Sequence, residues 1–204
     1  MSRFPGTDGY EAEAPVLVER YEALQFDQVH ASILHLLPST PSRVLDIGAG
    51  TGRDAAAMAA LGHHVVAVEP TEALRQAAMK RHADAPIIWI DDGLPGLDLV
   101  RARGDLFDII MLTAVWMHLD ADERKRAMAA LSALLAPRGL AVFMLRHGPV
   151  PAGRRMFDVT WEETAALGAH YGLEARFAAL QPSLSSGNWQ AGVTWSRGIL
   201  QRSA

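Results

Sequence analysis

The residues with the clearest chemical potential in this 204-residue chain lie around a glycine-rich turn. An apolar run at residues 44–47 predicts a buried strand, and Gly48, Gly50 and Gly52 follow it at alternate positions. An alanine-rich run then predicts a helix. Glycines in such a turn allow positive φ and let a ligand approach the backbone closely. The order strand, glycine turn, helix therefore indicates a site in which main-chain N–H groups line a ligand.

Two carboxylates flank this turn and narrow the choice of ligand. Glu69 ends a second predicted strand, His64–Val68, about 20 residues after the turn, the spacing at which an acid reaches ribose hydroxyls. A dinucleotide fingerprint needs G-x-G-x-x-G, but Arg53 or Asp54, depending on alignment, replaces the third glycine. Asp46, just before the turn, would repel a pyrophosphate but can accept hydrogen bonds from an ammonium group. A nucleoside with a cationic amino-acid tail suits these residues better than NAD.

The segment Asp46-Ile47-Gly48-Ala49-Gly50-Thr51-Gly52, followed by Glu69, closely resembles the cofactor signature of class I S-adenosylmethionine-dependent methyltransferases. The resemblance covers the chain from about Ser42 to the C-terminus. It implies an α/β fold with a doubly wound, Rossmann-like, seven-stranded mixed sheet, whose last strand is antiparallel and forms a hairpin with its neighbour. We expect one domain over residues 1–204, with residues 1–40 as an N-terminal helical cap.

The resemblance also implies S-adenosylmethionine as cofactor and S-adenosylhomocysteine as product. The glycine turn and Asp46 would hold the methionine end, and Glu69 would hold the ribose. Asp91 or Asp92 would bind the adenine amino group, with Asp91 preferred and the other aspartate solvated or capping a turn. The expected cofactor-binding residues are Asp46, Gly48, Ala49, Gly50, Gly52, Glu69, Pro70, Asp91, Asp92 and Thr113.

In this family the N-terminal segment often covers the cofactor cleft and contributes to substrate selection. The segments after the fourth and fifth predicted strands should lie at the carboxyl edge of the sheet, where open α/β sheets bind ligands. His118 could act as a base or orient a substrate hydroxyl, or it could only fix its loop. Methyl transfer from a sulfonium depends above all on alignment, so a base is needed only when the acceptor must lose a proton. The other candidates, each with ordinary packing or a solvated loop as the alternative, are Tyr21, Trp116, Arg146 and His147, then Tyr10, Phe26, His30, Arg154, Arg155, Trp189 and Gln190.

Periodicity and turn signals predict the elements that position these residues. We expect helical structure over Tyr10–Leu37 with a break near residues 25–27, and further helices after Thr71, Asp120 and Thr160. The predicted strands cover residues 44–47, 64–68, 87–90, 107–112, 140–145, 173–180 and 192–200. Residues 1–9 should be irregular, and residues 183–188 should form a turn.

The composition limits the class of function. A net charge of −4 argues against a nucleic-acid backbone as the main partner. The lack of cysteine excludes disulfides and thiolate chemistry, and scattered histidines predict no metal site. No apolar run approaches the ~20 residues of a membrane span, and residues 1–6 lack a signal-peptide core. We therefore expect a cytoplasmic protein with a small-molecule acceptor, of undetermined oligomeric state.

Two other functions remain open at this point. A protein could bind S-adenosylmethionine or S-adenosylhomocysteine without catalysis, because intact cofactor residues do not require turnover. A nicotinamide-dependent oxidoreductase is disfavoured by the glycine spacing and by Asp46.

Overall fold

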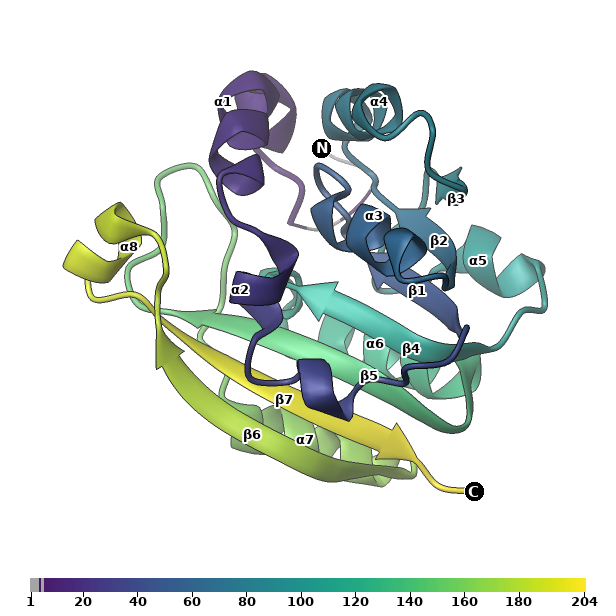
Figure 1. Ribbon diagram of the computed structural model, residues 1–204. Coiled ribbons are helices and arrows are strands. Elements are labelled where there is room, and N and C mark those ends of the chain that lie inside the picture. Colours follow the sequence, from purple (N-terminus) through teal and green to yellow (C-terminus); the bar gives the residue numbers. More distant parts are fainter. Residues whose placement is uncertain (1–3, 5) are drawn as a thin grey trace.

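The fold is organised around a seven-stranded sheet in the computed structural model, which describes residues 4 and 6–204 (Figure 1). The strand order is β3-β2-β1-β4-β5-β7-β6. β7 is antiparallel to both of its neighbours, whereas β1 to β5 are mutually parallel. The strands are β1 Arg43–Ile47, β2 His64–Val68, β3 Ile87–Ile90, β4 Phe107–Thr113, β5 Leu135–His147, β6 Leu173–Pro182 and β7 Thr194–Arg202. The expected doubly wound mixed sheet is confirmed.

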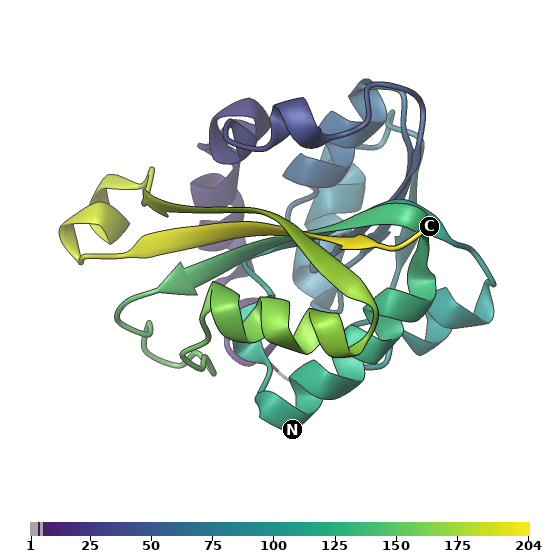
Figure 2. The same ribbon diagram turned by 90° about the horizontal axis from the view of Figure 1, so that it is seen from below.

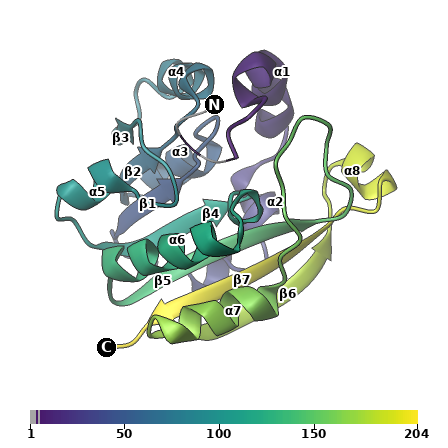
Figure 3. The ribbon, with the colours of Figure 1, turned by 180° about the vertical axis from the view of Figure 1, so that it is seen from behind.

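Helices cover both faces of the sheet, as Figures 2 and 3 show from two directions. On one face lie α2, η1 and α3; on the other lie α5, α6 and α7. α1 packs beside α4 (Figure 1). The helices are α1 Tyr10–Glu22, α2 Phe26–His30, η1 Leu34–Leu36, α3 Arg53–Ala60, α4 Glu72–Arg81, α5 Asp98–Ala102, η2 Trp116–His118, α6 Ala121–Leu134, α7 Trp161–His170 and α8 Ser186–Gln190.

Two of the predicted helix starts have the hydrogen bonds that the sequence indicates. Before α6, the Glu123 N–H donates to Asp120 Oδ1 and the Asp120 N–H donates to Glu123 Oε2, each at 2.8 Å. Thr160 and Glu163 form the same reciprocal pair before α7. These capping boxes satisfy backbone donors that a helix start leaves free. Thr71 is the N-cap residue of α4, but its side chain makes no capping hydrogen bond.

Several predicted boundaries were wrong, for local reasons. Regular helix ends well before Leu37, which is extended because Pro38 disfavours helical backbone in the residue before it. β5 begins at Leu135, immediately after α6, and not at residue 140 as predicted. Residues 186–190 form the short helix α8 where a turn was expected. β3 is an edge strand with Ile88 about half exposed, and not the fully buried strand that its apolar run predicted.

The expectations about the N-terminus fall partly on residues 1–3 and 5, which lie outside the described residues. Gly6, Asp8 and Gly9 lie in turns that lead into α1. In the part of the chain that the structure describes, no helix has the length and apolar character required to cross a membrane.

Candidate functional site

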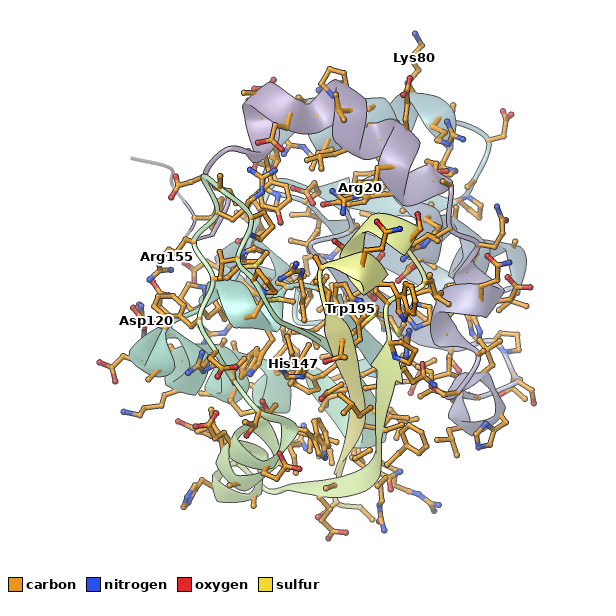
Figure 4. The ribbon with its side chains drawn as sticks, turned by 90° about the vertical axis from the view of Figure 1, so that its left-hand side faces the viewer. Arg20, Lys80, Asp120, His147, Arg155 and Trp195 are labelled. Atoms are coloured by element: carbon orange, nitrogen blue, oxygen red, sulfur yellow. The ribbon has the colours of Figure 1, made fainter. Side chains whose placement is uncertain are left out.

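A cavity of about 490 Å³ lies at the carboxyl ends of the parallel strands. Open α/β sheets bind their ligands at this edge, and the volume falls within the range of small-molecule sites. Its walls come from the glycine turn after β1, the segment after β2, the loop after β4, the face of α1 and the segment before α8. Figure 4 shows α1 above α8 on this side of the molecule.

The glycine turn has the backbone geometry that its composition predicts. Gly48 has φ 66°, and a Cβ added there would lie 2.6 Å from the Val115 side chain. Gly50 has φ 57°, but a Cβ there would meet nothing nearer than Tyr21 at 3.9 Å. The first glycine is therefore required for packing, whereas the second leaves free space beside the backbone for a ligand. Gly52 is the N-cap residue of α3 and does not line the cavity.

Glu69 links the glycine turn after β1 to the segment after β2. Its Oε2 accepts a hydrogen bond from the Gly50 N–H and its Oε1 accepts one from the Thr71 N–H, each at 2.8 Å. Burial raises the pKa of Glu69, while hydrogen bonds from Thr71 and Gly50 and the nearby Arg75 oppose that rise. A carboxylate has about four acceptor positions, so these two backbone bonds leave capacity for further donors from the cavity.

Asp46 is a buried carboxylate with one unused oxygen. It lines the cavity with 2 % of its surface exposed, and its Oδ2 has no hydrogen-bond partner among the described residues. Burial raises the pKa of Asp46 well above its usual range, and the charge of Asp54 raises it further. Because an unpaired buried acceptor is costly, this oxygen is suited to a donor from a ligand.

Asp54 is the centre of a network that the sequence reasoning missed. Its carboxylate accepts hydrogen bonds from His30 Nε2 at 2.8 Å, Thr113 Oγ1 at 2.7 Å and Arg53 Nε at 2.7 Å. Burial alone would raise the pKa of Asp54, but His30 and Arg53 together lower it below the usual value. His30 is fully buried against the Phe26 ring, so it supports the cavity wall and does not line it. In the sequence, Asp54 stands out only as a possible replacement for the third glycine of the dinucleotide fingerprint.

His118 lines the cavity, but both of its ring nitrogens are engaged. Nδ1 lies 2.7 Å from the Arg155 carbonyl, which can only accept, so Nδ1 carries the proton. The Tyr10 hydroxyl then donates to Nε2 at 3.1 Å. Burial lowers the pKa of His118, which favours this neutral form. The geometry fits the structural alternative better than the general base, because Tyr10 occupies the only nitrogen that could accept a substrate proton.

The two consecutive arginines after β5 are bound by acidic residues of this chain. Arg155 pairs with Asp120 at 3.0 Å and Glu123 at 2.7 Å, and Figure 4 shows Arg155 next to Asp120. Arg154 pairs with Glu13 at 2.7 Å and lies 4.0 Å above the Tyr10 ring. The loop that follows β5 is therefore fixed to α6 on one side and to α1 on the other.

The aspartates after β3 differ from the expected arrangement of one ligand and one solvated residue. Asp92 is buried and accepts hydrogen bonds from the N–H groups of Gly93, Leu99 and Val100 at 2.8 to 3.1 Å. It caps α5, and so it is neither solvated nor free to bind adenine. Asp91 is about half exposed and lies 3.3 Å from Arg75. Neither aspartate lines the cavity.

The structure brings most of the remaining candidates to the cavity. Those that line it are Asp46, Gly48, Ala49, Gly50, Glu69, Pro70, Thr113, Tyr10, Tyr21, His118, Arg146 and Arg154. Trp116 does not, because it is fully buried with its ring against Phe143, so ordinary packing, the alternative for this residue, is what the structure shows. His147 also does not. Side chains alternate along a strand, and since Arg146 faces the cavity, His147 faces away and contacts Ser196.

The cavity residues that were not predicted include Met144 on β5 and Trp195 and Arg197 on β7. In the strand pairing, Met144 lies opposite Arg197, and Arg146 lies opposite Trp195. Directly opposite residues share a face of the sheet. The pairing of β5 with β7, which local sequence does not reveal, is therefore what brings them to the site.

The strand order, the glycine turn after β1 and the carboxylate after β2 together define the class I methyltransferase fold. The profile of the family described as "Methyltransferase domain" matches residues 20–176, and the chain belongs to this family.

Among curated proteins, the chain is similar to a demethylmenaquinone methyltransferase from Clavibacter sepedonicus, with 29 % identity over 63 % of this chain and 51 % of that protein. It is also similar to an uncharacterized methyltransferase from Bacillus pumilus, with 28 % identity over 66 % of this chain and 57 % of the relative. The match thus spans about half the length of these relatives.

Two solved structures illustrate the shared fold. A TehB-like S-adenosylmethionine-dependent methyltransferase from Corynebacterium glutamicum has TM-score 0.68 and 20 % identity, covering 94 % of this chain and 98 % of that one. The 1,6-didemethyltoxoflavin-N1-methyltransferase of Burkholderia thailandensis, solved with 1,6-didemethyltoxoflavin and S-adenosylhomocysteine, has TM-score 0.68 and 21 % identity, covering 95 % and 90 %.

Proposed function

We propose that this protein transfers a methyl group from S-adenosylmethionine to a small-molecule acceptor. The observation that carries the proposal is the pair of buried carboxylates, Asp46 and Glu69, that flank the glycine turn at the cavity. A diphosphate would be repelled by this pair, whereas a nucleoside that bears an ammonium group can satisfy both. Membership of the methyltransferase domain family supports the same reaction.

The donors of such a cofactor match the acceptors on the cavity wall. Asp46 Oδ2, which has no partner in the described chain, would accept from the methionine ammonium group. The further acceptor capacity of Glu69 would take the ribose hydroxyls. The methionine chain would pass over Gly48, Ala49 and Gly50, and Pro70 and Thr113 would complete the walls. Asp91 stays our proposed partner for the adenine amino group, beside the cavity-lining Gly93 and Leu94.

When bound, the cofactor supplies an activated methyl group on a sulfonium, and the neutral thioether is the leaving group. The chain has to align the acceptor with that methyl group. In the sheet order β4 lies between β1 and the β5–β7 pair, so Thr113 and the loop after β4 would separate the proposed cofactor position from an acceptor beside Met144. His118 would hold Tyr10 of α1 in the cavity wall, because it joins Tyr10 to the Arg155 carbonyl through its two hydrogen bonds.

A small acceptor fits the available space and agrees with the relatives. The cavity of about 490 Å³ is far too small for a folded macromolecule. The Burkholderia structure holds a small heterocycle beside S-adenosylhomocysteine, and the Clavibacter relative is named for demethylmenaquinone. The names of those two proteins give 1,6-didemethyltoxoflavin and demethylmenaquinone as the methylated compounds. The acceptor of this chain is a separate question.

The test is calorimetric titration of the full chain with S-adenosylmethionine, S-adenosylhomocysteine and NAD, followed by an assay of S-adenosylhomocysteine formation with a panel of small acceptors. We expect micromolar binding of the first two ligands, no binding of NAD, and turnover with at least one acceptor. NAD binding would overturn the proposal in favour of an oxidoreductase. Tight cofactor binding without turnover on any acceptor would favour the binding protein without catalysis.

A further inference from the structure

Three of the guanidinium groups in the cavity wall, those of Arg20 on α1, Arg146 on β5 and Arg197 on β7, make up what we call the arginine cluster. Among the described residues, no carboxylate lies within ion-pairing distance of any of the three. The other two arginines that line the cavity, Arg53 and Arg154, are each paired with a carboxylate. The arginine cluster is therefore the part of the wall where positive charge is uncompensated.

Arg197 is the most unusual member of the cluster because it is buried. It lies on β7 with 3 % of its surface exposed. Its Nε donates to Gln181 Oε1 at 2.9 Å, and its Nη1 approaches the Met144 sulfur at 3.5 Å. Burial lowers the pKa of Arg197 to about 10. The negative charge of Asp54 raises this pKa, but the Asp54 carboxylate already binds His30 and Arg53. A buried cation with only an amide and a thioether as partners is costly.

Arg146 and Arg20 have neutral partners too. Arg146 Nη1 donates to the Pro149 carbonyl at 2.7 Å, and Arg20 Nη2 donates to Asn188 Oδ1 at 3.1 Å. Burial and the charge of Arg20 both lower the pKa of Arg146, so the two cations repel each other. Trp195, opposite Arg146 in the strand pairing, adds an aromatic surface; Figure 4 shows it below Arg20 on the same side.

We propose that the methyl acceptor is a small aromatic or heteroaromatic carboxylic acid, whose carboxylate is bound by Arg197 with Arg146 and Arg20, and whose ring packs on Trp195. The proposal rests on the methyl-transfer function proposed above and specifies its substrate class. An Arg guanidinium has a planar set of donors that matches a carboxylate in a two-bond geometry. A bound carboxylate would also compensate the charge that the cavity wall leaves unpaired.

The experiment measures ligand binding to the protein saturated with S-adenosylhomocysteine, by calorimetric titration. The probes are pairs that differ only in charge: benzoate with benzamide, and indole-3-acetate with indole-3-acetamide. We expect each acid to bind at least ~10-fold tighter than its amide, because charge-assisted hydrogen bonds are stronger than neutral ones. The preference should disappear in Arg197→Met and be retained in Arg176→Gln, an exposed arginine on β6.

The measured cofactor affinity distinguishes a failure of the proposed acceptor class from a failure of the proposed methyl-transfer function. Failure of S-adenosylhomocysteine to bind the wild-type protein would overturn the methyl-transfer function. Normal cofactor binding without any preference for acids would overturn only the acceptor class. If Arg197→Met weakens S-adenosylhomocysteine binding ~10-fold or more, Arg197 binds the methionine carboxylate instead, and this result also overturns the proposed acceptor class. Competition by inorganic phosphate as strong as by benzoate would indicate a phosphate site.

Should Arg197→Met fail to fold, Arg146→Gln provides a second variant, since Arg146 is only partly buried. It should reduce the preference for acids while leaving S-adenosylhomocysteine affinity within ~3-fold of the wild type. An unchanged preference in this variant would contradict the arginine cluster as the carboxylate site.

Discussion

Replacing Glu69 by glutamine tests the centre of the proposed cofactor site with almost no change in side-chain shape. In the structure, each oxygen of Glu69 accepts a backbone hydrogen bond, from Gly50 or from Thr71, at 2.8 Å. A glutamine amide has only one oxygen. Its NH₂ group must therefore face one of the two N–H donors, and the carboxylate charge that would bind the ribose hydroxyls is lost.

The expected size of the effect comes from counting these bonds. A hydrogen bond to a charged group contributes ~1.5–3 kcal/mol, and at least one such bond to the cofactor would be lost in Glu69→Gln. The dissociation constant for S-adenosylhomocysteine should rise ~10- to 100-fold. The free protein should also lose ~1–3 kcal/mol of unfolding free energy, because either the Gly50 or the Thr71 N–H is left buried without an acceptor.

Calorimetric titration measures the dissociation constant for S-adenosylhomocysteine, and urea unfolding measures the free energy of unfolding. Glu72→Gln is the matched control: it makes the same chemical change three residues away, at an exposed position outside the cavity. The control should change neither quantity by more than ~0.5 kcal/mol. Equal cofactor affinity in Glu69→Gln and the wild type would show that Glu69 only braces the glycine turn, and the ribose assignment would then be refuted.

Four other substitutions test separate parts of the reasoning. Burial raises the pKa of the Asp46 carboxyl group in the folded state. The stability that this group contributes is therefore fully present below its pKa in the unfolded state, ~4, and is lost as the pH rises through its higher pKa in the folded state. Asp46→Asn should therefore flatten the pH dependence of urea unfolding while weakening S-adenosylhomocysteine binding ~10-fold; strong binding by this variant would contradict the ammonium contact. Gly50→Val should keep the folded circular dichroism spectrum and bind S-adenosylhomocysteine at least ~10-fold more weakly, because its side chain would enter the cavity at φ 57°; full affinity would contradict the close approach. Gly198→Ala should lose ~1–3 kcal/mol in urea unfolding, because the added Cβ would lie 2.1 Å from the Trp161 ring, and an unchanged midpoint would refute that packing. His118→Ala should reduce turnover less than ~100-fold if the residue is structural, since removing a general base costs ~10²–10⁴-fold.

The parts of the site that sequence predicts are those encoded by neighbouring residues. The glycine turn lies within a few positions of the strand and helix that it joins, and Glu69 follows the next strand. The capping box of Asp120 with Glu123 is equally local. In such segments the backbone conformation and the chemistry depend on the same few residues, and the observed geometry follows from their types.

The parts that sequence reasoning missed depend on which strands become neighbours. An apolar β3 looks like a central strand until the sheet order places it at the edge. Arg197 on β7 carries no local signal, and it becomes a cavity residue only because β7 pairs with β5 so that Arg197 lies opposite Met144. Asp92 had a local alternative as a turn cap, but its partners at the start of α5 lie seven and eight residues further along the chain.

The contacts that hold α1 over the cavity also bear on how ligands enter it. α1 is joined to the loops after β4 and β5 by the Tyr10–His118 hydrogen bond and by the Arg154–Glu13 ion pair. Both contacts are polar, and α1 buries only Ala14 and Leu17 completely. Segments with few buried apolar contacts open at low free-energy cost. Breaking these two polar contacts would free α1 from the loops after β4 and β5 without disturbing the sheet, so Asp46 and Glu69 would stay in place while cofactor and product exchange.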